Sequence, residues 1–517
     1  MKPVCRFLQK FASLIVCVLS CFDRVLFKGH LSLSRATELE KFVDCVLKIR
    51  RVDFLKKLAP QYGERLVEHA KKLAHEAGRP YEYRRGKFRK EKWAAGLLRE
   101  QGLCDGLVGV LCTMETCPTF RLLPGQARPR FVPTRAPQRV LYFYFLDGDL
   151  GLIHVRLQTW LPFTLQICVN GHDYVAQQMA KKKLGFVQQD NAFTQLDEPA
   201  QAQKLADQFA KLKWPTILKR YALRVNPLLH DILKGLDYYW VTDQAEYATD
   251  LLFSGKEALA GLFAKLLEFA WLTFSPKDLL GFLGRKLHGR FDGEVLTDCK
   301  TERAPGARIK HRVKNNWLKM YDKFGLILRV ETVINQPREF KIYRACTRKD
   351  GTRYWAWRPM PKGVGNLHSY QRHALACNQR YLQALALVDD PTPAHQQLAK
   401  LTEPQRVDQR SYAGFNPARQ QELRLFAAVL DGDHIAQGFR NRDIRTVLYN
   451  SSTDSKESRR QSAAVGRLLK RLHLRHFLAK VPRTRRWKVT DQGRRVLGDA
   501  LAVYRRYWPE RCSRPAA

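Results

Sequence analysis

ARIKHRVKNNWLKMYDKFGLILRVETVINQPREFKIYR, residues 307–344, is the stretch of sequence that decides the fold. Polar and apolar residues alternate along it, and turn-forming residues interrupt the alternation at 314–316 and 324–325. The pattern predicts three antiparallel strands, over 309–313, 317–323 and 326–334. A meander of this kind predicts a sheet rather than a helical bundle as the centre of the chain.

The third predicted strand carries a carboxylate at its middle. A period of two places Ile327, Arg329, Glu331 and Val333 on one face of that strand. An acidic residue inside an apolar strand departs from the local pattern, and such departures often mark functional sites. The alternative is an ordinary ion pair between Arg329 and Glu331 on a half-exposed sheet.

Other apolar runs up to residue 388 also predict strands. The segments 140–146 and 152–158 flank the turn Asp147–Gly151 and predict a hairpin. Strand patterns alternate with helical ones over this region. We therefore expect an α+β fold, with a mixed or antiparallel sheet and surrounding helices.

Two segments of this core have a less regular pattern. We interpret 124–137, which is rich in proline and arginine, as a loop. We interpret 243–253 as a helix, on which Glu246 and Asp250 share one face. Like charges at that spacing cost stability unless a cation or a metal ion lies between them.

Charge is the unusual feature of the composition. The 517 residues include 90 Lys and Arg but only 49 Asp and Glu, which gives a formal net charge of +41. Such an excess repels itself unless a polyanion offsets it, so nucleic acid is the first partner to expect and an anionic membrane surface the second. Of the nucleic acids, we favour DNA over RNA. No segment approaches the length of about 20 apolar residues that a membrane span needs, so no membrane partner is expected.

The cysteines argue against a disulfide or zinc framework. Twelve cysteines are spaced irregularly and none forms a CxxC pair. We expect free thiols and a reducing cytoplasmic location. The basic and apolar start of the chain, which superficially resembles a short signal sequence, is better explained as an amphipathic helix that leads into a strand over 22–28.

Familiar catalytic motifs are absent from the sequence. It contains no P-loop, dinucleotide fingerprint, HExxH, GxSxG or zinc-finger spacing. Metal-assisted phosphodiester cleavage requires two or three carboxylates that converge on Mg²⁺ or Mn²⁺. We select Asp23, Glu331 and Asp298 as candidate ligands, and Asp147, Asp149 and Glu294 as further carboxylates that folding can bring close.

A tyrosine nucleophile is a second catalytic hypothesis. The run Lys319–Lys323, with Tyr321 at its centre, is followed by Leu328–Glu331, and together they resemble a segment of phage and plasmid rolling-circle replication initiators. The resemblance covers about fifteen residues and implies strand nicking by Tyr321. Those initiators use a His-x-His metal motif, which this sequence lacks. The meander cations Arg308, Lys310, Arg312, Lys319 and Lys323 are expected to contact the nucleic-acid backbone.

The last hundred residues resemble a winged-helix DNA-binding domain of the multiple-antibiotic-resistance regulator (MarR) type. Their predicted order is three helices, a short hairpin and a closing helix. The resemblance implies that the third helix, 458–475, enters the major groove and that the hairpin acts as a wing at the phosphates or minor groove. The implied contacts are Arg459, Arg460, Arg467, Lys470 and Arg471 on the helix, and Arg483, Arg485 and Arg486 on the wing.

The whole chain resembles a large, functionally unassigned group of bacterial proteins. That group shares the FDRVLFKG segment, the QTWLPF segment, the RIKH-to-YDK meander and a winged-helix end. The resemblance implies architecture only. It also draws attention to Gln158–Phe163, Asn170-Gly171 and Asp190-Asn191, whose alternative role is turn geometry.

These observations predict a core over 1–388, divisible into 1–200 and 201–388, a linker over 389–415 and a winged helix over 416–510. The leading hypothesis is a mobile-element-type DNA-processing protein, such as a replication initiator, transposase or nuclease, with metal-dependent strand cleavage or strand transfer. The alternative is a non-catalytic winged-helix transcriptional regulator or an RNA-binding protein.

Overall fold

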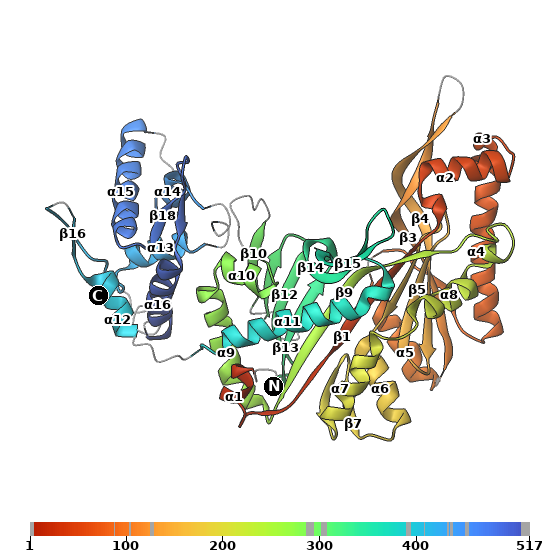
Figure 1. The fold of residues 1–517 in the computed structure, drawn as a ribbon, viewed down its shortest axis with the longest axis horizontal. Helices are drawn as coiled ribbons and strands as arrows, with labels where there is room; N and C mark the ends of the chain where they lie inside the picture. The colour runs from red at the N-terminus through yellow and green to blue at the C-terminus, as the bar shows by residue number, and fades with distance from the viewer. Residues whose placement is uncertain are drawn as a thin grey trace. The chain divides into compact units, whose positions relative to one another are not determined.

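The fold is α+β, with a large mixed sheet and surrounding helices (Figure 1). The structure is a computed structural model, and it describes residues 5–86, 88–102, 105–124, 129–285, 294–300, 308–388, 394–407, 409–431, 434, 438–449 and 454–507. The chain forms two compact units. One comprises Cys17–Asp250 and Val333–Leu375, and the other comprises Met1–Val16, Leu251–Thr332 and Ala376–Ala517.

The unit built mainly from 17–250 contains the longer run of strands, in the order β9-β1-β6-β5-β4-β3-β2. Neighbouring strands with a described register are antiparallel, apart from the parallel pair β2–β3. The strands are β1 (Ile15–His30), β2 (Tyr81–Tyr83), β3 (Gly106–Leu123), β4 (Arg130–Asp147), β5 (Gly151–Gln158), β6 (Leu165–Val169) and β9 (Tyr239–Phe253).

Helices and two small hairpins complete this unit. Burial along β5 alternates between buried and partly buried residues, as expected for a strand with a packed face. The helices are α2 (Ala36–Lys41), α3 (Arg51–Asp53), α4 (Ala59–Glu76), α5 (Lys90–Gln101), α6 (Gly171–Lys181), α7 (Pro199–Phe209) and α8 (Trp214–Val225). The hairpins are β7 (Phe186–Gln189) with β8 (Ala192–Leu196), and β14 (Lys341–Thr347) with β15 (Arg353–Pro359).

The meander is confirmed and lies in the other unit, in the strand order β10-β11-β12-β13. Its strands are β10 (Val295–Lys300), β11 (Arg308–Val313), β12 (Asn316–Lys323) and β13 (Ile327–Ile334). Every residue of β13 is buried, so the alternative explanation of Glu331, which placed it on a half-exposed sheet, was wrong on this point. Helices α1 (Arg6–Lys10), α9 (Lys256–Thr273) and α10 (Pro276–Phe282) belong to this unit, and α11 (Leu367–Leu385) runs from one unit into the other.

The predicted helix over 243–253 is in fact part of strand β9. Aromatic and β-branched residues at 239–242 favour an extended chain, and they extend that conformation through the following segment. A spacing of four residues is even, so Glu246 and Asp250 share a face in a strand as they would in a helix. The like-charge pair was therefore noticed in the sequence but assigned to the wrong element.

The predicted loop over 124–137 is strand from Arg130 onward, where β4 begins, and residues 125–128 lie outside the part of the chain that the structure describes. β5 pairs with β4 only from Val140 onward. Pro133 and Pro137 therefore lie where one side of β4 carries no β5 partner. A proline, which lacks an N–H donor, is tolerated at such a position.

The C-terminal module, whose helices are drawn in blue in Figure 1, has its own hydrophobic core. Its elements follow the predicted order of three helices, a short hairpin and a closing helix. They are α13 (Gln420–Val429), α14 (Asn441–Leu448), α15 (Ser455–Leu474), the pair β18 (Leu478–Lys480) and β19 (Trp487–Val489), and α16 (Asp491–Tyr507).

The segment expected to be a linker carries structure of its own. Helix α12 (Ala394–Thr402) and the hairpin of β16 (Gln405–Val407) and β17 (Arg410–Tyr412) lie within 389–415. Leu401 and Phe415 are fully buried in the core of the C-terminal module. The irregular spacing of apolar residues concealed two short elements that pack onto a neighbouring domain core.

Candidate metal centre

Strand β1 places Asp23 among buried apolar residues. Its neighbours Phe22 and Val25 are fully buried, and Asp23 itself is only 6% exposed. The side-chain amide of Asn191 donates to Oδ1 of Asp23, and Nδ1 of His172 lies 3.3 Å from the same oxygen. Because a buried carboxylate is unfavourable without polar partners, these contacts fix its position as well as offsetting its burial.

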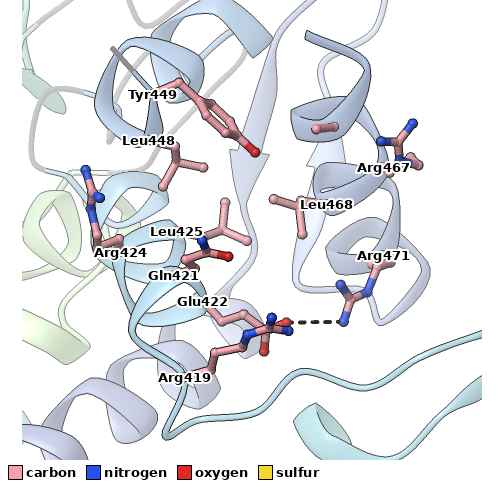
Figure 2. A pocket seen from close by; sticks show the side chains of 11 residues that line it. Arg419, Gln421, Glu422, Arg424, Leu425, Leu448, Tyr449, Arg467, Leu468 and Arg471 are labelled. Atoms are coloured by element: carbon pink, nitrogen blue, oxygen red, sulfur yellow. Dashed lines mark ion pairs between the residues drawn. The ribbon is translucent and has the colours of Figure 1, made fainter. Parts of the chain in front are cut away.

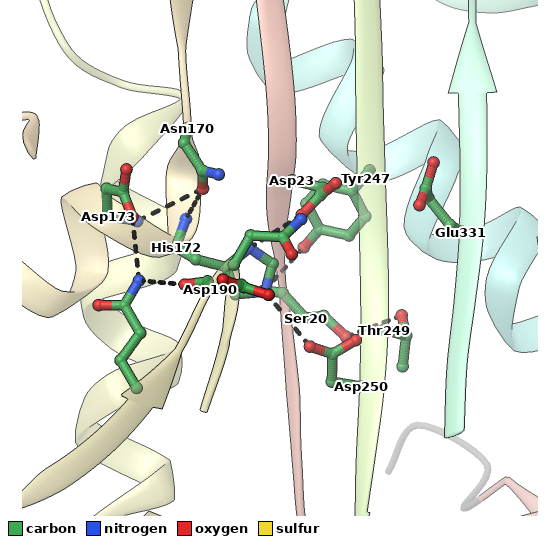
Figure 3. A network of polar contacts seen from close by, with 12 residues as sticks. Ser20, Asp23, Asn170, His172, Asp173, Asp190, Tyr247, Thr249, Asp250 and Glu331 are labelled. Atoms are coloured by element: carbon green, nitrogen blue, oxygen red, sulfur yellow. Dashed lines mark hydrogen bonds and ion pairs between the residues drawn. The ribbon is translucent and has the colours of Figure 1, made fainter. Parts of the chain in front are cut away.

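The start of helix α6 brings His172 to Asp23. Asn170 caps this helix, and its side-chain oxygen accepts from the backbone N–H of His172 at 2.7 Å (Figure 3). A Cβ on Gly171 would lie 2.2 Å from the carbonyl oxygen of Phe22, so only glycine permits this close approach of α6 to β1. The Asn170-Gly171 pair therefore does more than form a turn, because it seats an imidazole beside the strand.

His172 lies between two carboxylates. It is completely buried, with Nδ1 toward Asp23 and Nε2 3.3 Å from Oδ2 of Asp250 (Figure 3). Asp173, the next residue, accepts from Gln188, and burial raises the pKa of Asp173 to about 6. Three acidic side chains, one of them from α6 itself, thus lie at this end of the helix.

Strand β9, the neighbour of β1 in the sheet, supplies Glu246. Glu246 is 6% exposed and forms an ion pair with Arg24 at 2.8 Å. The Arg24 side chain is half exposed and also contacts Gln244. A buried carboxylate is thereby linked to a cation that solvent or a ligand can reach.

Strand β13 supplies Glu331, which is 1% exposed. Nζ of Lys319 lies 2.6 Å from its Oε1, and the hydroxyl of Tyr321 donates to its Oε2 at 2.5 Å. Both contacts come from β12 within the same meander. Glu331 forms an ion pair with Lys319, and Arg329, the partner named in the alternative explanation, is fully buried.

Asp23, Glu246 and Glu331 form a buried acidic triad. Each offers one carboxylate oxygen, and these oxygens lie within 4.8 Å of one another. Carboxylate oxygens are the ligands that Mg²⁺ and Mn²⁺ prefer, and three of them so close together repel one another without a cation. The donor set therefore fits a hard divalent cation.

Two of the three predicted metal ligands belong to the triad. Asp23 and Glu331 are brought together as selected, whereas Asp298 is not part of the triad. Asp298 lies on β10, three positions from β13 in the strand order, and forms an ion pair with Arg308 at 3.5 Å. Glu246 takes the third place. The sequence singled it out only as a partner of Asp250, because its segment was assigned to a helix rather than to strand β9.

The other carboxylates considered have structural partners. Asp147 accepts from Arg220, from the Tyr221 hydroxyl and from the backbone of its own turn. Asp149 pairs with Lys181, and Glu294 pairs with Arg312. These interactions explain the three residues as parts of turns and surface ion pairs.

The meander cations serve different purposes. Lys319 is bound to Glu331, and Lys323 is buried. Lys310 lies over the Trp317 ring at 3.6 Å, and burial together with nearby Lys319 lowers the pKa of Lys310. The expected phosphate contacts Arg308 and Arg312 pair with Asp298 and Glu294 respectively.

In the C-terminal module, an exposed cationic face runs along α15. Its members, Arg459, Arg460, Arg467 and Lys470, recur at helical spacing and are all exposed. On the hairpin side, Arg483 and Arg485 are exposed as well, whereas Arg486 donates to the carbonyl of Gly438. Six of the eight residues expected to contact DNA are therefore accessible.

Arg471 faces inward instead. It donates to the carbonyls of Ala413 and Gly414 and lies 3.6 Å from Glu422 (Figure 2). These contacts join α15 to α13 and to the preceding segment, so we assign Arg471 to the packing of the module. With Arg467 it also lines a pocket of about 480 Å³, whose other residues are Arg419, Gln421, Glu422, Arg424, Leu425, Leu448, Tyr449, Ala464 and Leu468.

Within the described residues, no single helix is long and apolar enough to cross a membrane. Helices α9 and α10 pass such a test only when taken together, and the chain bends by 115° between them. Comparisons with protein-family models, with curated proteins and with solved structures found no match to this chain.

Proposed function

We propose that the protein is a divalent-cation-dependent enzyme that cuts or transfers strands of nucleic acid. The observation that carries the proposal is the buried triad of Asp23, Glu246 and Glu331 in a chain of net charge +41. Buried carboxylates that converge are costly to stability even where each has a polar or cationic neighbour, and a metal site is a use that offsets the cost. The excess of positive charge points to a polyanionic substrate.

The protein's own side chains prepare the triad for this chemistry. Asn191 and His172 hold Asp23, while Lys319 and Tyr321 hold Glu331. When bound there, Mg²⁺ or Mn²⁺ would stabilise negative charge on the attacking and leaving oxygens of a phosphodiester. Arg24, half exposed beside Glu246, would contact a phosphate oxygen of the substrate.

In the hydrolytic form of the reaction, a water oxygen bonds to phosphorus and one phosphorus–oxygen ester bond breaks. The proton lost by the water is balanced by a proton that the departing oxygen gains. In strand transfer, a terminal hydroxyl takes the place of the water. Tyr321 is assigned here to positioning, because its hydroxyl donates to Glu331. A covalent role for Tyr321 remains a separate prediction from the replication-initiator resemblance.

The test is incubation of the full chain with labelled single-stranded, duplex and structured nucleic acids, with and without Mg²⁺ or Mn²⁺. We expect metal-dependent cleavage or joining by the wild type and none by Asp23→Asn or Glu246→Gln. Asp298→Asn is the matched control, because this carboxylate lies on the meander in a surface ion pair. Activity that survives both triad substitutions would refute the proposed site.

We propose that the C-terminal module is a winged helix that delivers the enzyme to DNA. The exposed cations of α15 would contact the major groove, and Arg483 and Arg485 the flanking phosphates. Replacement of Arg467 and Lys470 by alanine should weaken duplex binding and reduce the slope of log affinity against log salt by about 1 for each lost phosphate contact. An unchanged slope would mean that another surface contacts the duplex.

The second candidate is a non-catalytic regulator or RNA-binding protein. The observation that favours it is the same exposed cationic face of α15, which requires no chemistry from the core. Binding to nucleic acid without cleavage under every metal condition would favour this candidate. We place either version in the cytoplasm, since the ten cysteines that the structure describes are all free thiols.

A further inference from the structure

The hairpin formed by β14 and β15 exposes three aromatic side chains side by side. Tyr343 is 53% exposed, Trp355 is 63% exposed and Trp357 is 66% exposed. Tyr343 lies directly opposite Trp357 in the strand register. Its ring centroid is 5.6 Å from that of Trp355, with an angle of 28° between the ring planes, and 5.8 Å from that of Trp357.

The alternation of the two strands keeps these rings on one face. Tyr343 shares its face with Lys341 on β14, while Trp355 and Trp357 share theirs with Arg353 on β15; all five side chains are exposed. The register pairs Lys341 with Pro359 at one end of the aromatic cluster and Arg353 with Thr347 at the other. A cation thus stands at each end of a row of rings.

Tyr354, the aromatic residue on the opposite face of β15, is contacted by arginine side chains of the hairpin. Tyr354 receives a hydrogen bond from Arg358 at 2.8 Å, and the guanidinium of Arg348 lies 5.3 Å from the centre of its ring. The aromatic segment near β2 is also covered by its own cations, since Arg85 lies over Tyr83 and Arg84 over Phe88. Exposed aromatic groups of this size usually mark a binding surface.

Charge indicates the kind of partner. Residues 341–359, KIYRACTRKDGTRYWAWRP, contain six Lys and Arg and one acidic residue, Asp350. That carboxylate caps its own turn, where it accepts from the backbone N–H of Thr352 at 2.9 Å. Flat rings and an excess of cations match a partner that combines flat apolar groups with regular negative charge.

We propose that the β14–β15 face binds single-stranded nucleic acid, with bases stacked on Tyr343, Trp355 and Trp357 and phosphates at Lys341 and Arg353. Stacking requires unpaired bases, because a duplex already covers the faces of its own bases. The proposal rests on the proposed function in one respect, since it names where the enzyme holds an unpaired strand. An anionic membrane surface also attracts tryptophan and arginine, so it enters the test as the competing occupant.

The experiment measures binding of the full chain to fluorescent single-stranded DNA and RNA oligonucleotides by anisotropy, without divalent metal, over a series of salt concentrations. We expect Trp355→Ala and Trp357→Ala each to lower affinity about tenfold without changing the slope of log affinity against log salt. Lys341→Ala and Arg353→Ala should each reduce that slope by about 0.7. Trp355→Phe and Trp357→Phe should retain most of the affinity.

Trp271→Ala is the matched control, because Trp271 is a half-exposed tryptophan on helix α9 of the other unit. It should leave binding unchanged, and circular dichroism should show all variants folded. Unaltered oligonucleotide affinity in the double variant Trp355→Ala/Trp357→Ala would overturn the proposal. So would binding of the wild type to phosphatidylserine vesicles, lost in that variant, without binding to oligonucleotides.

The readout separates this proposal from the proposed catalytic function. Asp23→Asn should bind single strands as the wild type does, because the measurement requires no metal. Loss of cleavage in Asp23→Asn with intact binding would support both proposals. Absence of cleavage in the wild type, together with tryptophan-dependent binding, would refute catalysis alone.

Discussion

Two histidines, His172 and His311, are completely buried, and each lies between two polar side chains. His172 stands between the carboxylates of Asp23 and Asp250 at 3.3 Å on both sides. His311 stands between the hydroxyls of Thr297 and Tyr381 at 2.9 Å on both sides. The same residue type is therefore placed once in an acidic setting and once in a neutral one.

This difference distinguishes a candidate ligand-binding site around His172 from a structural contact around His311. Around His311, a neutral imidazole can donate with one nitrogen and accept with the other, so the hydroxyls complete its hydrogen bonding. Burial lowers the pKa of His311 to about 3, which keeps the ring neutral. Around His172, both ring nitrogens face carboxylates, and a third acidic residue, Asp173, follows it in the chain. Groups that satisfy one another hold a fold together, whereas accumulated charge of one sign indicates a ligand.

The largest expected effect concerns the acidic side of this comparison. Asp23→Asn should lower metal-dependent strand cleavage by about a hundredfold or more, because a ligand that stabilises transition-state charge is lost. The same substitution should raise or leave unchanged the melting temperature without metal, since it removes one of several crowded carboxylates. Cleavage assays and thermal unfolding of the same preparation measure both. A large loss of stability would instead assign Asp23 to the scaffold.

The neutral network should respond in the opposite way. His311→Leu should lower the free energy of unfolding by about 2–3 kcal/mol, because the buried hydroxyl of Tyr381 loses its partner. Adding Tyr381→Phe should recover part of the loss, since replacing both partners by apolar groups is far less costly than replacing one. Denaturant unfolding of the two single variants and the double variant measures this coupling. Additive losses would show that the two side chains do not form a unit.

The pH dependence of the unfolding free energy should report on the same hydrogen-bonded network around His311. The pKa of His311 is lowered by burial, so its contribution to stability is fully present above the unfolded-state value of about 6.5 and is lost as the pH falls toward about 3. Wild-type stability should therefore decline over that window, and His311→Leu should decline less steeply. Urea unfolding at a series of pH values provides the slopes. Parallel slopes in the two proteins would contradict the assignment.

A smaller effect of opposite sign is expected at Asp173, beside the acidic centre. Burial raises the pKa of Asp173 to about 6, so its contribution to stability is present below the unfolded-state value and is lost as the pH rises through about 6. Asp173→Asn keeps an oxygen for Gln188 and should stabilise the protein at about pH 8 but not at about pH 4. Equal stability changes at both pH values would argue against a buried carboxylate with a raised pKa.

The strands that carry the site could largely be predicted from the sequence. Period-two alternation predicted β11, β12 and β13 and therefore the place of Glu331, and a short apolar run predicted the part of β1 that holds Asp23. Local pattern could not predict which carboxylates meet, because Asp23 and Glu246 are 223 positions apart and meet only through strand order. Asp298 was selected as a carboxylate at a strand end or within a strand, yet the strand order puts β10, which carries it, at the edge of the sheet.

Local sequence pattern also could not predict the role of the residues at the start of helix α6, for another reason. The Asn170-Gly171 pair was noticed as a turn, and as a turn it is unremarkable in sequence. Its importance comes from the carbonyl of Phe22, which lies where a side chain on residue 171 would be. The two carboxylates beside His172, Asp23 and Asp250, come from two different strands that are distant in sequence, so no local motif links them to the histidine. Contacts of this kind depend on tertiary packing.

The central claim is that the triad binds a divalent cation. It is tested by titrating the purified full chain with Mn²⁺ and following binding by calorimetry or by the electron paramagnetic resonance signal of Mn²⁺. We predict a saturable site in the wild type, in His311→Leu and in Asp298→Asn, and its loss in Asp23→Asn and Glu246→Gln. Undiminished Mn²⁺ binding in both triad variants, or no saturable site in the wild type, would contradict the account.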